Sequence, residues 1–198
     1  LDACTTGSWN TAIGYEALTT STTGERNVAV GRTAANALTD GRYNVAVGMA
    51  ALESQTTADD NTSIGYNSMN ANTTGEPNTA VGRSALAVNT TGSDNTAIGA
   101  YALDAATTGS HNTALGGAAL GALTTGTQNT ALGRTSGDSI TTGNYNLCIG
   151  YNTDTGSATS DRRFVIGQDF VGTTNNAVHI GASGGHIRND FLDDATWD

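Results

Sequence analysis

The sequence predicts an all-β fold, a parallel β-solenoid or β-roll with 17-residue coils, assembled as an elongated homotrimer. A short motif, in which asparagine is followed by Thr or Val, Ala, an aliphatic residue and Gly, returns with minor changes at a constant spacing. No insertion breaks this spacing, as a stack of coils requires, because one extra residue would turn interior side chains outward. Glycine is also frequent, at 26 residues. Two glycines in each unit would cost a helix about 2 kcal/mol.

The first element of each unit is a predicted strand over positions 0 to 4, counted from the asparagine. Strand side chains alternate, so positions 1 and 3 form a bulky face and positions 0, 2 and 4 a small face. We predict that the aliphatic row at position 3 is core and that the small face lets another backbone approach. The predicted core row is Ile13, Val30, Val47, Ile64, Val81, Ile98, Leu115, Leu132, Ile149 and Ile166.

The asparagines at position 0 predict a ladder along the axis of the stack. Parallel strands stack about 4.8 Å apart, so identical residues lie over one another and their amides can bond from coil to coil. The predicted ladder is Asn10, Asn27, Asn44, Asn61, Asn78, Asn95, Asn112, Asn129 and Asn146.

The remaining elements follow in order around the unit. Positions 7 and 8 form a short apolar segment, often Ala-Leu as at Ala85 and Leu86. Positions 12 to 14 are usually a Thr-Thr-Gly turn, which we expect to form a second ladder, and the glycine at position 14 suits a residue with positive φ. Positions 15 and 16 are mostly polar and are interpreted as a solvated turn.

A thin core predicts the oligomeric state. About two bulky apolar residues per coil give weak support for ordering a whole unit, since burial contributes about 25 cal/mol per Å². We therefore expect a partner chain to complete the core, and a homotrimer with cyclic symmetry about the long axis is the simple solution. The handedness of the coil stays open.

Two regions are expected within the chain. Residues 1–167 form the repeat shaft in ten register copies, the last of which begins with Arg163 in place of asparagine. Residues 168–198 form an irregular C-terminal cap segment, because the next similar glycine, Gly181, follows Gly167 too early for the repeat.

Composition and motifs exclude several functions. A net charge of −10 without any lysine argues against nucleic-acid binding. No apolar run is long enough to insert into a membrane. No catalytic or phosphate-binding motif is present, so we expect no enzyme, no catalytic residue and no cofactor.

A few side chains are candidates for chemistry. His179 and His186 could form a three-nitrogen metal site near a trimer axis, with His111 a weaker candidate, although a satisfied structural histidine is the favoured interpretation. Cys148 is interpreted as a small buried residue, too many coils from Cys4 to pair with it. Acidic residues at turns are interpreted as solvated charges instead of calcium ligands: Asp59, Asp60, Glu76, Asp94, Asp190, Asp193 and Asp194. Aromatic residues beside the strands are interpreted as turn packing instead of a glycan groove: Trp9, Tyr15, Tyr43, Tyr66, Tyr101, Tyr145 and Tyr151.

The repeat resembles two known families. Units of the form GxxNTAxGxxAL, such as 75–86 and 109–120, resemble the head repeats of trimeric autotransporter adhesins, which form trimers of left-handed parallel β-rolls. The longer form TTGxxNTAxGxxAL is more similar to phage tail fibres. Residues 186–198 resemble the stretch that precedes the self-cleaving intramolecular chaperone of phage fibres.

The resemblance implies a structural and attachment segment of a phage tail fibre, acting in host-cell adhesion without catalysis. A bacterial trimeric autotransporter head or another extracellular appendage is the alternative, and an ice-binding solenoid is a remote one. The expected partners are further copies of the chain and a host surface glycan or protein receptor. The expected location is the virion or the cell exterior.

Overall fold

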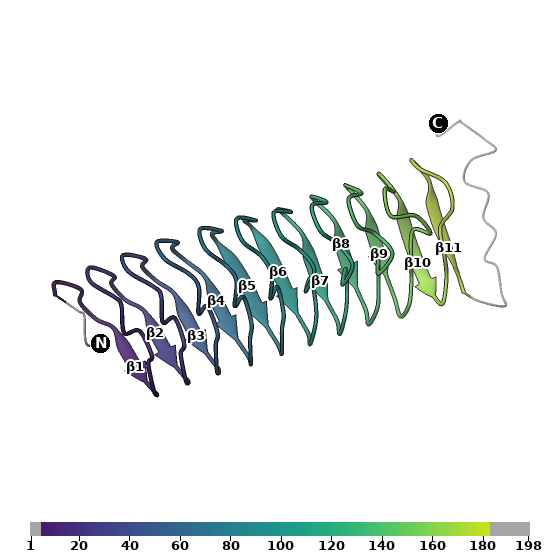
Figure 1. The fold of residues 1–198 in the computed structure, drawn as a ribbon. Coiled ribbons are helices and arrows are strands. Elements are labelled where there is room, and N and C mark those ends of the chain that lie inside the picture. The colour runs from purple at the N-terminus through teal and green to yellow at the C-terminus, as the bar shows by residue number, and fades with distance from the viewer. Residues whose placement is uncertain (1–4, 183–198) are drawn as a thin grey trace, which may run out of the picture.

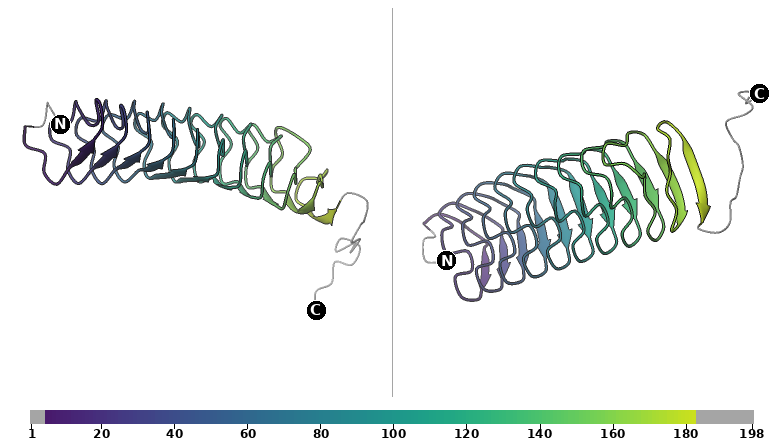
Figure 2. Two further views of the ribbon diagram at one scale, coloured as in Figure 1. Left: turned by 90° about the horizontal axis from the view of Figure 1, so that it is seen from below. Right: turned by 45° about the vertical axis from the view of Figure 1, so that its right-hand side comes forward.

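The computed structural model describes residues 5–182, which form a single elongated rod (Figure 1). Eleven strands lie in one parallel sheet in sequence order, which confirms the predicted all-β solenoid. The strands line one side of the rod along its length, and turns form its other walls (Figure 2). The strands are β1 Thr11–Ile13, β2 Val28–Val30, β3 Val45–Val47, β4 Thr62–Ile64, β5 Asn78–Val81, β6 Asn95–Ile98, β7 Thr113–Leu115, β8 Thr130–Leu132, β9 Leu147–Ile149, β10 Phe164–Gln168 and β11 Val178–Ala182.

Strand pairing keeps the register of the repeat from β1 to β10. Ala80 lies opposite Ala97, for example, and Ala97 opposite Ala114. The final pair differs, because Gly167 of β10 lies opposite Gly181 of β11, and the connection between these strands is shorter than a full coil. The sheet therefore continues through Ala182, past the shaft boundary that the repeat suggests at residue 167. Residues 183–198 of the predicted cap segment lie outside the described residues.

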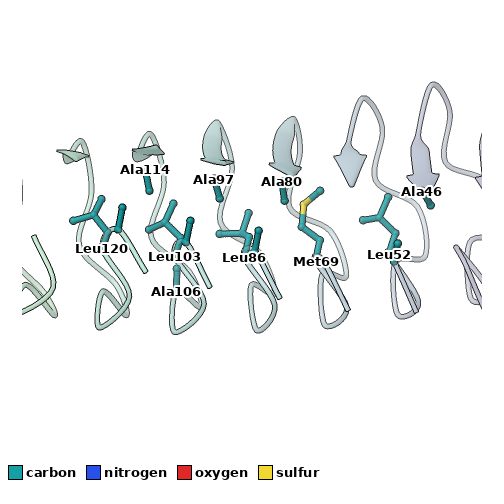
Figure 3. Packing of buried hydrophobic residues seen from close by; sticks show 14 of the residues in the cluster. Ala46, Leu52, Met69, Ala80, Leu86, Ala97, Leu103, Ala106, Ala114 and Leu120 are labelled. Atoms are coloured by element: carbon teal, nitrogen blue, oxygen red, sulfur yellow. The ribbon is translucent and has the colours of Figure 1, made fainter. Parts of the chain in front are cut away.

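The interior of each coil is built from small residues of the strand and aliphatic residues of the opposite wall. Alanines at position 2, including Ala97 and Ala114, are fully buried. They point toward the Ala-Leu segment at positions 7 and 8, where Leu103 and Leu120 are also fully buried (Figure 3). Position 11 completes the core with Leu38, Leu123 and Ile140, or with buried polar residues in the middle coils. Each coil therefore closes its own small core within one chain.

This packing corrects the predicted assignment of the two strand faces. The small face, which was expected to receive another backbone from outside, packs on the opposite wall of its own coil. The position-3 row instead points outward, and four of its members are largely exposed, among them Ile13 at 61% and Leu115 at 46%. The coil is too narrow to hold branched side chains from both walls, so alanine faces inward and the aliphatic residue outward. None of the row from Ile13 to Ile166 belongs to the single-chain core.

The asparagine ladder is present and fully bonded. Oδ1 of each asparagine accepts the backbone N–H of the next one, as from Asn112 to Asn95 at 3.0 Å. Nδ2 of Asn95 donates to the carbonyl of Gly109, 2.8 Å away. Both kinds of bond recur along the ladder from Asn10 to Asn146. The ladder thus satisfies backbone groups at the strand entrance, which would otherwise be buried without partners.

Two further hydrogen-bond ladders connect successive coils at positions 12 and 15. Hydroxyls at position 12 donate to the position-12 carbonyl of the next coil, as from Thr90 to Thr107 at 3.1 Å, which gives the expected threonine ladder. At position 15, short polar side chains accept the backbone N–H of the preceding coil, as from Ser93 to Ser110 at 3.0 Å. The polar turn is therefore selected for hydrogen bonding as well as for solvation.

The turns contain residues with left-handed backbone conformation at positions where the sequence pattern does not predict it. The position-4 glycines from Gly14 to Gly150 have a positive φ, up to 144° at Gly116, but the glycines at position 14 do not. Non-glycine residues take the left-handed conformation instead at positions 6, 8 and 16, as Tyr101, Leu103 and His111 do. The prediction for position 14 is wrong, and close packing is the reason for glycine there. A Cβ on Gly109 would lie 2.4 Å from the carbonyl oxygen of Gly126.

Candidate functional site

The outer sheet face is the most distinctive surface of the rod. We define it as the outward side chains at positions 1 and 3 of β1 to β11. Position 3 is aliphatic throughout, and position 1 is Thr or Val in most coils. Exposed large apolar side chains lie on it at both ends and in the middle: Ile13, Ile64, Ile98, Leu115, Val178 and Ile180. Rows of exposed apolar side chains are uncommon on monomeric soluble proteins and are typical of surfaces that contact another molecule.

Two columns of larger side chains flank this face. The position-16 margin precedes each strand and consists of Trp9, Arg26, Tyr43, Asp60, Pro77, Asp94, His111, Gln128, Tyr145 and Arg162. The position-5 margin follows each strand and consists of Tyr15, Arg32, Met49, Tyr66, Arg83, Ala100, Gly117, Arg134, Tyr151 and Gln168. Apart from Gly117, all of these residues are exposed.

Arginines in the margins stack on aromatic rings of adjacent coils. The Arg26 guanidinium lies 4.5 Å from the ring centroid of Trp9 and 5.3 Å from that of Tyr43. Arg83 lies between Tyr66 and Tyr101, and Arg162 lies over Tyr145. Such contacts contribute about 0.5–1 kcal/mol each at exposed sites. Aromatic residues that were interpreted as turn packing therefore form ordered columns with arginine.

Charge is distributed unevenly around the rod. Five arginines lie in the two margins, although the chain has only eight cationic residues and a net charge of −10. Asp60 and Asp94 are the two acids in these columns. Glu25, next to the position-16 margin, lies 3.8 Å from Arg26. The outer sheet face is thus apolar in its centre and carries most of the chain's positive charge at its edges.

The described histidines lie beside polar groups of their own chain, and a three-histidine metal site between copies of the chain stays a prediction. His179 Nε2 lies 3.1 Å from the Thr174 hydroxyl, and His111 Nδ1 lies 3.6 Å from a carboxylate oxygen of Asp94. Across residues 5–182, no group of three or more His, Cys, Asp or Glu side chains is placed to hold a metal ion. His186 lies outside the described residues.

Cys148 occupies the inward position 2 of β9, as the sequence suggests. Its thiol is buried and unpaired by any disulfide, and this burial, followed by the charge of Asp154, raises its pKa to about 12. The thiol therefore stays protonated and unreactive at neutral pH. Cys4 lies outside the described residues.

Acidic residues at the turns mostly serve the position-15 ladder. Asp59 accepts the backbone N–H of Arg42 at 2.7 Å, and Glu76 accepts that of Asp59. Asp60 and Asp94 are exposed in the position-16 margin. Asp190, Asp193 and Asp194 lie outside the described residues.

A separate pair of acids faces the gap left by Gly121. A side chain on Gly121 would meet Asp138 Oδ1 at 3.2 Å and Asp104 Oδ1 at 3.4 Å. Partial burial raises the pKa of both carboxyls; the charge of Asp138 adds to this for Asp104, and that of Asp154 for Asp138. The sequence pattern did not identify this pair, because position 9 varies widely among the coils.

Threonine forms one exposed row. At position 12 the hydroxyls are half-buried and bonded along the axis, while position 13 is exposed in the described coils, mostly as threonine. The structure thus presents a single outward threonine column instead of a two-residue array, as the adjacency of the two threonines predicts.

The C-terminal coils end the asparagine ladder with a buried cation. Arg163 replaces asparagine at position 0 and is only 8% exposed. Its backbone N–H continues the ladder to Asn146 Oδ1 at 3.1 Å. Its guanidinium donates to the carbonyls of Thr155 and Gly172 and to Asn175 Oδ1. Arg163 therefore joins the last regular coil to the shorter loop before β11.

Comparisons with known proteins add no relative. No protein-family model, no curated protein and no solved structure matches the chain. Residues 5–182 contain no helix that is long and apolar enough to span a membrane.

Proposed function

We propose that this protein is a structural and attachment rod, a segment of a phage tail fibre that works as a parallel homotrimer. The observation that carries this proposal is the outer sheet face, which has an aliphatic side chain at position 3 of every coil and no partner within the described chain. A monomeric rod would leave this strip in water along its whole length.

Self-association of identical chains fits this surface better than a different partner would. Every coil presents the same chemistry at the same height, so a parallel copy matches the face coil by coil. Cyclic symmetry about the long axis brings the faces of all copies together and leaves none open. Three copies follow from the resemblance of the repeat to trimeric fibres and adhesin heads.

The described residues also favour a mechanical role over chemistry. Their ladders tie each coil to the next through backbone and side-chain bonds, as a spacer under load requires. Contact with a host surface glycan or protein receptor is proposed for the irregular end, residues 153–197, because regular ladders repeat one surface and only this end offers a unique one. An autotransporter adhesin head or other extracellular appendage is the second candidate, on the same repeat resemblance.

A matched pair of substitutions tests the assembly. Ile98 on the outer sheet face and Val88 on another wall are similarly exposed, at 38% and 42%. The wild type should have a native mass of about 60 kDa by light scattering, three times the chain mass of 20.0 kDa. Ile98→Asp should yield folded monomer, whereas Val88→Asp should leave the mass unchanged. A folded monomeric wild type would refute the trimer.

Attachment is tested on cells with the whole chain. Val171 is an exposed residue of the irregular end, at 48%. Fluorescently labelled Val171→Asp protein should bind host cells less well than the wild type, whereas Val88→Asp protein should bind equally well. If Val171→Asp and Val88→Asp reduced cell binding equally, the adhesive surface would lie on the shaft instead of the irregular end.

A further inference from the structure

The two margins of the outer sheet face would meet in the proposed assembly. This inference rests on the proposed self-association. When each copy turns its face to a common axis, the position-5 margin of one copy lies beside the position-16 margin of the next. The residues of these columns therefore determine which coil of one copy lies opposite which coil of its neighbour.

We infer that the two margins meet one coil out of step, so that each position-5 residue faces the position-16 residue of the following coil in the second copy. Arg83, after β5, then lies opposite Asp94, before β6, of the second copy. Arg83 and Asp94 form the one ion pair of this register and fix the pairing of coils between chains.

Complementarity at the five arginines of the margins supports this register. Each arginine of the margins then faces an aromatic ring or a carboxylate, and no like charges meet. The pairs are Tyr15 with Arg26, Arg32 with Tyr43, Arg83 with Asp94, Arg134 with Tyr145, and Tyr151 with Arg162. Arginine over an aromatic face and arginine beside a carboxylate are both favourable, more so when water is excluded.

The side chains of the two margins match less well when the margins meet without any shift. With coils of equal height opposed, Arg32 faces Arg26 of the second copy, and Arg83 faces Pro77. Like charges brought together at an interface are costly, and an unpaired buried guanidinium adds to the cost.

The match is also poorer when each position-5 residue faces the position-16 residue of the preceding coil in the second copy. It pairs Arg83 with Asp60, but it places Arg134 opposite His111 and Met49 opposite Arg26. The aromatic partners of Arg134 and Arg162 are then lost.

The conformation of Arg83 suits a contact between copies. Its guanidinium lies 5.9 Å from the ring centroid of Tyr66 and 5.4 Å from that of Tyr101, which hold it in the margin. Within the described residues, no carboxylate lies within ion-pair distance of it, whereas Arg26 has Glu25 at 3.8 Å. Asp94 is exposed on the other margin beside His111.

Charge exchange in the full chain tests the register. Arg83→Asp and Asp94→Arg should each raise the protein concentration of half-dissociation by about tenfold or more, a factor that corresponds to about 1.4 kcal/mol. The double variant should restore it to near the wild-type value. Arg83→Asp with Asp60→Arg is the control for the opposite shift and should not restore it.

Disulfide trapping provides an independent readout. In a Cys4→Ser background, Arg83→Cys with Asp94→Cys should give covalent oligomers on oxidation, and Arg83→Cys with Asp60→Cys should not. If the wild type is monomeric, the proposed assembly itself fails. If the wild type assembles but Asp60, and not Asp94, rescues or cross-links Arg83, the assembly stands and the inferred register is overturned.

Discussion

Single residues of the repeat are chosen for backbone reasons as much as for packing. At position 4, glycine is required twice over. Gly116 has a φ of 144°, and a Cβ there would lie 2.4 Å from the carbonyl oxygen of Gly133 in the next coil. Its neighbour Gly117 has no such constraint, because a Cβ would meet only the Ala100 oxygen at 3.8 Å. Two adjacent glycines therefore differ completely in their roles.

This difference gives a sharp prediction. Gly116→Ala should destabilise the fold by more than about 1–3 kcal/mol, because it combines a forbidden backbone with overpacking against a carbonyl. Gly117→Ala should change the free energy of unfolding by about 0.5 kcal/mol or less. Thermal unfolding followed by circular dichroism measures both. Equal effects of the two substitutions would contradict the coil geometry at position 4.

Carboxyls on different sides of the coil should respond oppositely to pH. The pKa of Asp138 is raised in the folded protein, above all by burial. Its favourable contribution to stability is therefore complete below pH 3.8, the ordinary pKa of the carboxyl, and is lost as pH rises through the raised pKa of the folded state. Asp138→Asn should therefore raise the melting temperature slightly at neutral pH, and this gain should disappear in acid.

Asp40 is the matched control of opposite sign. Hydrogen bonds from the hydroxyls of Thr23 and Thr22 lower the pKa of Asp40 in the folded protein. Its contribution to stability is therefore present above pH 3.8, the ordinary pKa of the carboxyl, and is lost as pH falls through the lowered pKa of the folded state. Asp40→Asn should lower the melting temperature at neutral pH, again without effect in strong acid. Differential unfolding at a series of pH values checks both signs.

At the scale of the element, the two faces of each strand have separate roles. Ala97 is buried in the coil and Ile98 is exposed, so in the proposed assembly these adjacent residues of β6 serve folding and chain association respectively. Ala97→Leu should cost about 1–3 kcal/mol by overpacking the core beside Leu103. The loss should appear in the unfolding of an Ile98→Asp background, where assembly is already removed. Loss of assembly without loss of chain stability would restore the idea that the small face is a contact between chains.

The sequence was informative about the elements but not about their orientation. The invariant spacing of the repeat was sufficient to predict strand register, the asparagine ladder and the thin coil. It could not decide which face of the strand is inside, because alternation alone allows either choice. The missing information was the course of the turns, in which residues at positions 6, 8 and 16 take the left-handed conformation. Tyr101 and Leu103 are ordinary residues in sequence terms, so nothing signals that conformation.

The candidate site was predictable only in part for a similar reason. Aromatic residues beside the strands were visible, but their alternation with arginine requires the coil to place positions 5 and 16 in columns. Arg26 and Tyr43 lie one full repeat apart in the sequence and become neighbours only through stacking. The Asp104–Asp138 pair spans two coils at a variable position, so a search for repeated residues would pass over it.

At the scale of the whole molecule, the rod is a one-dimensional array in which each coil contacts only its neighbours. Stability in such arrays is a sum of coil and interface contributions, and an end coil has a neighbour on one side alone. The C-terminal end is held by Arg163, whose guanidinium bonds to carbonyls of two loops and to Asn175. Cys148 lies one coil inside this anchor, opposite Val165 in the sheet. Its thiol is a natural reporter of how far the end opens.

Arg163→Ala should therefore release the last coils and expose Cys148. The folded thiol, with a pKa of about 12 and little access to solvent, should react with a maleimide only when its coil opens. In a Cys4→Ser background, the labelling rate should rise about tenfold or more, since loss of the bonds to two buried backbone carbonyls and to Asn175 exceeds about 1.4 kcal/mol. Arg162→Ala is the control, because that side chain is exposed and stacked on Tyr145, and it should leave labelling almost unchanged. Arg163→Ala could instead lower the melting temperature without faster labelling of Cys148 below the unfolding transition. That result would show that all coils unfold together and that the C-terminal coils do not open independently.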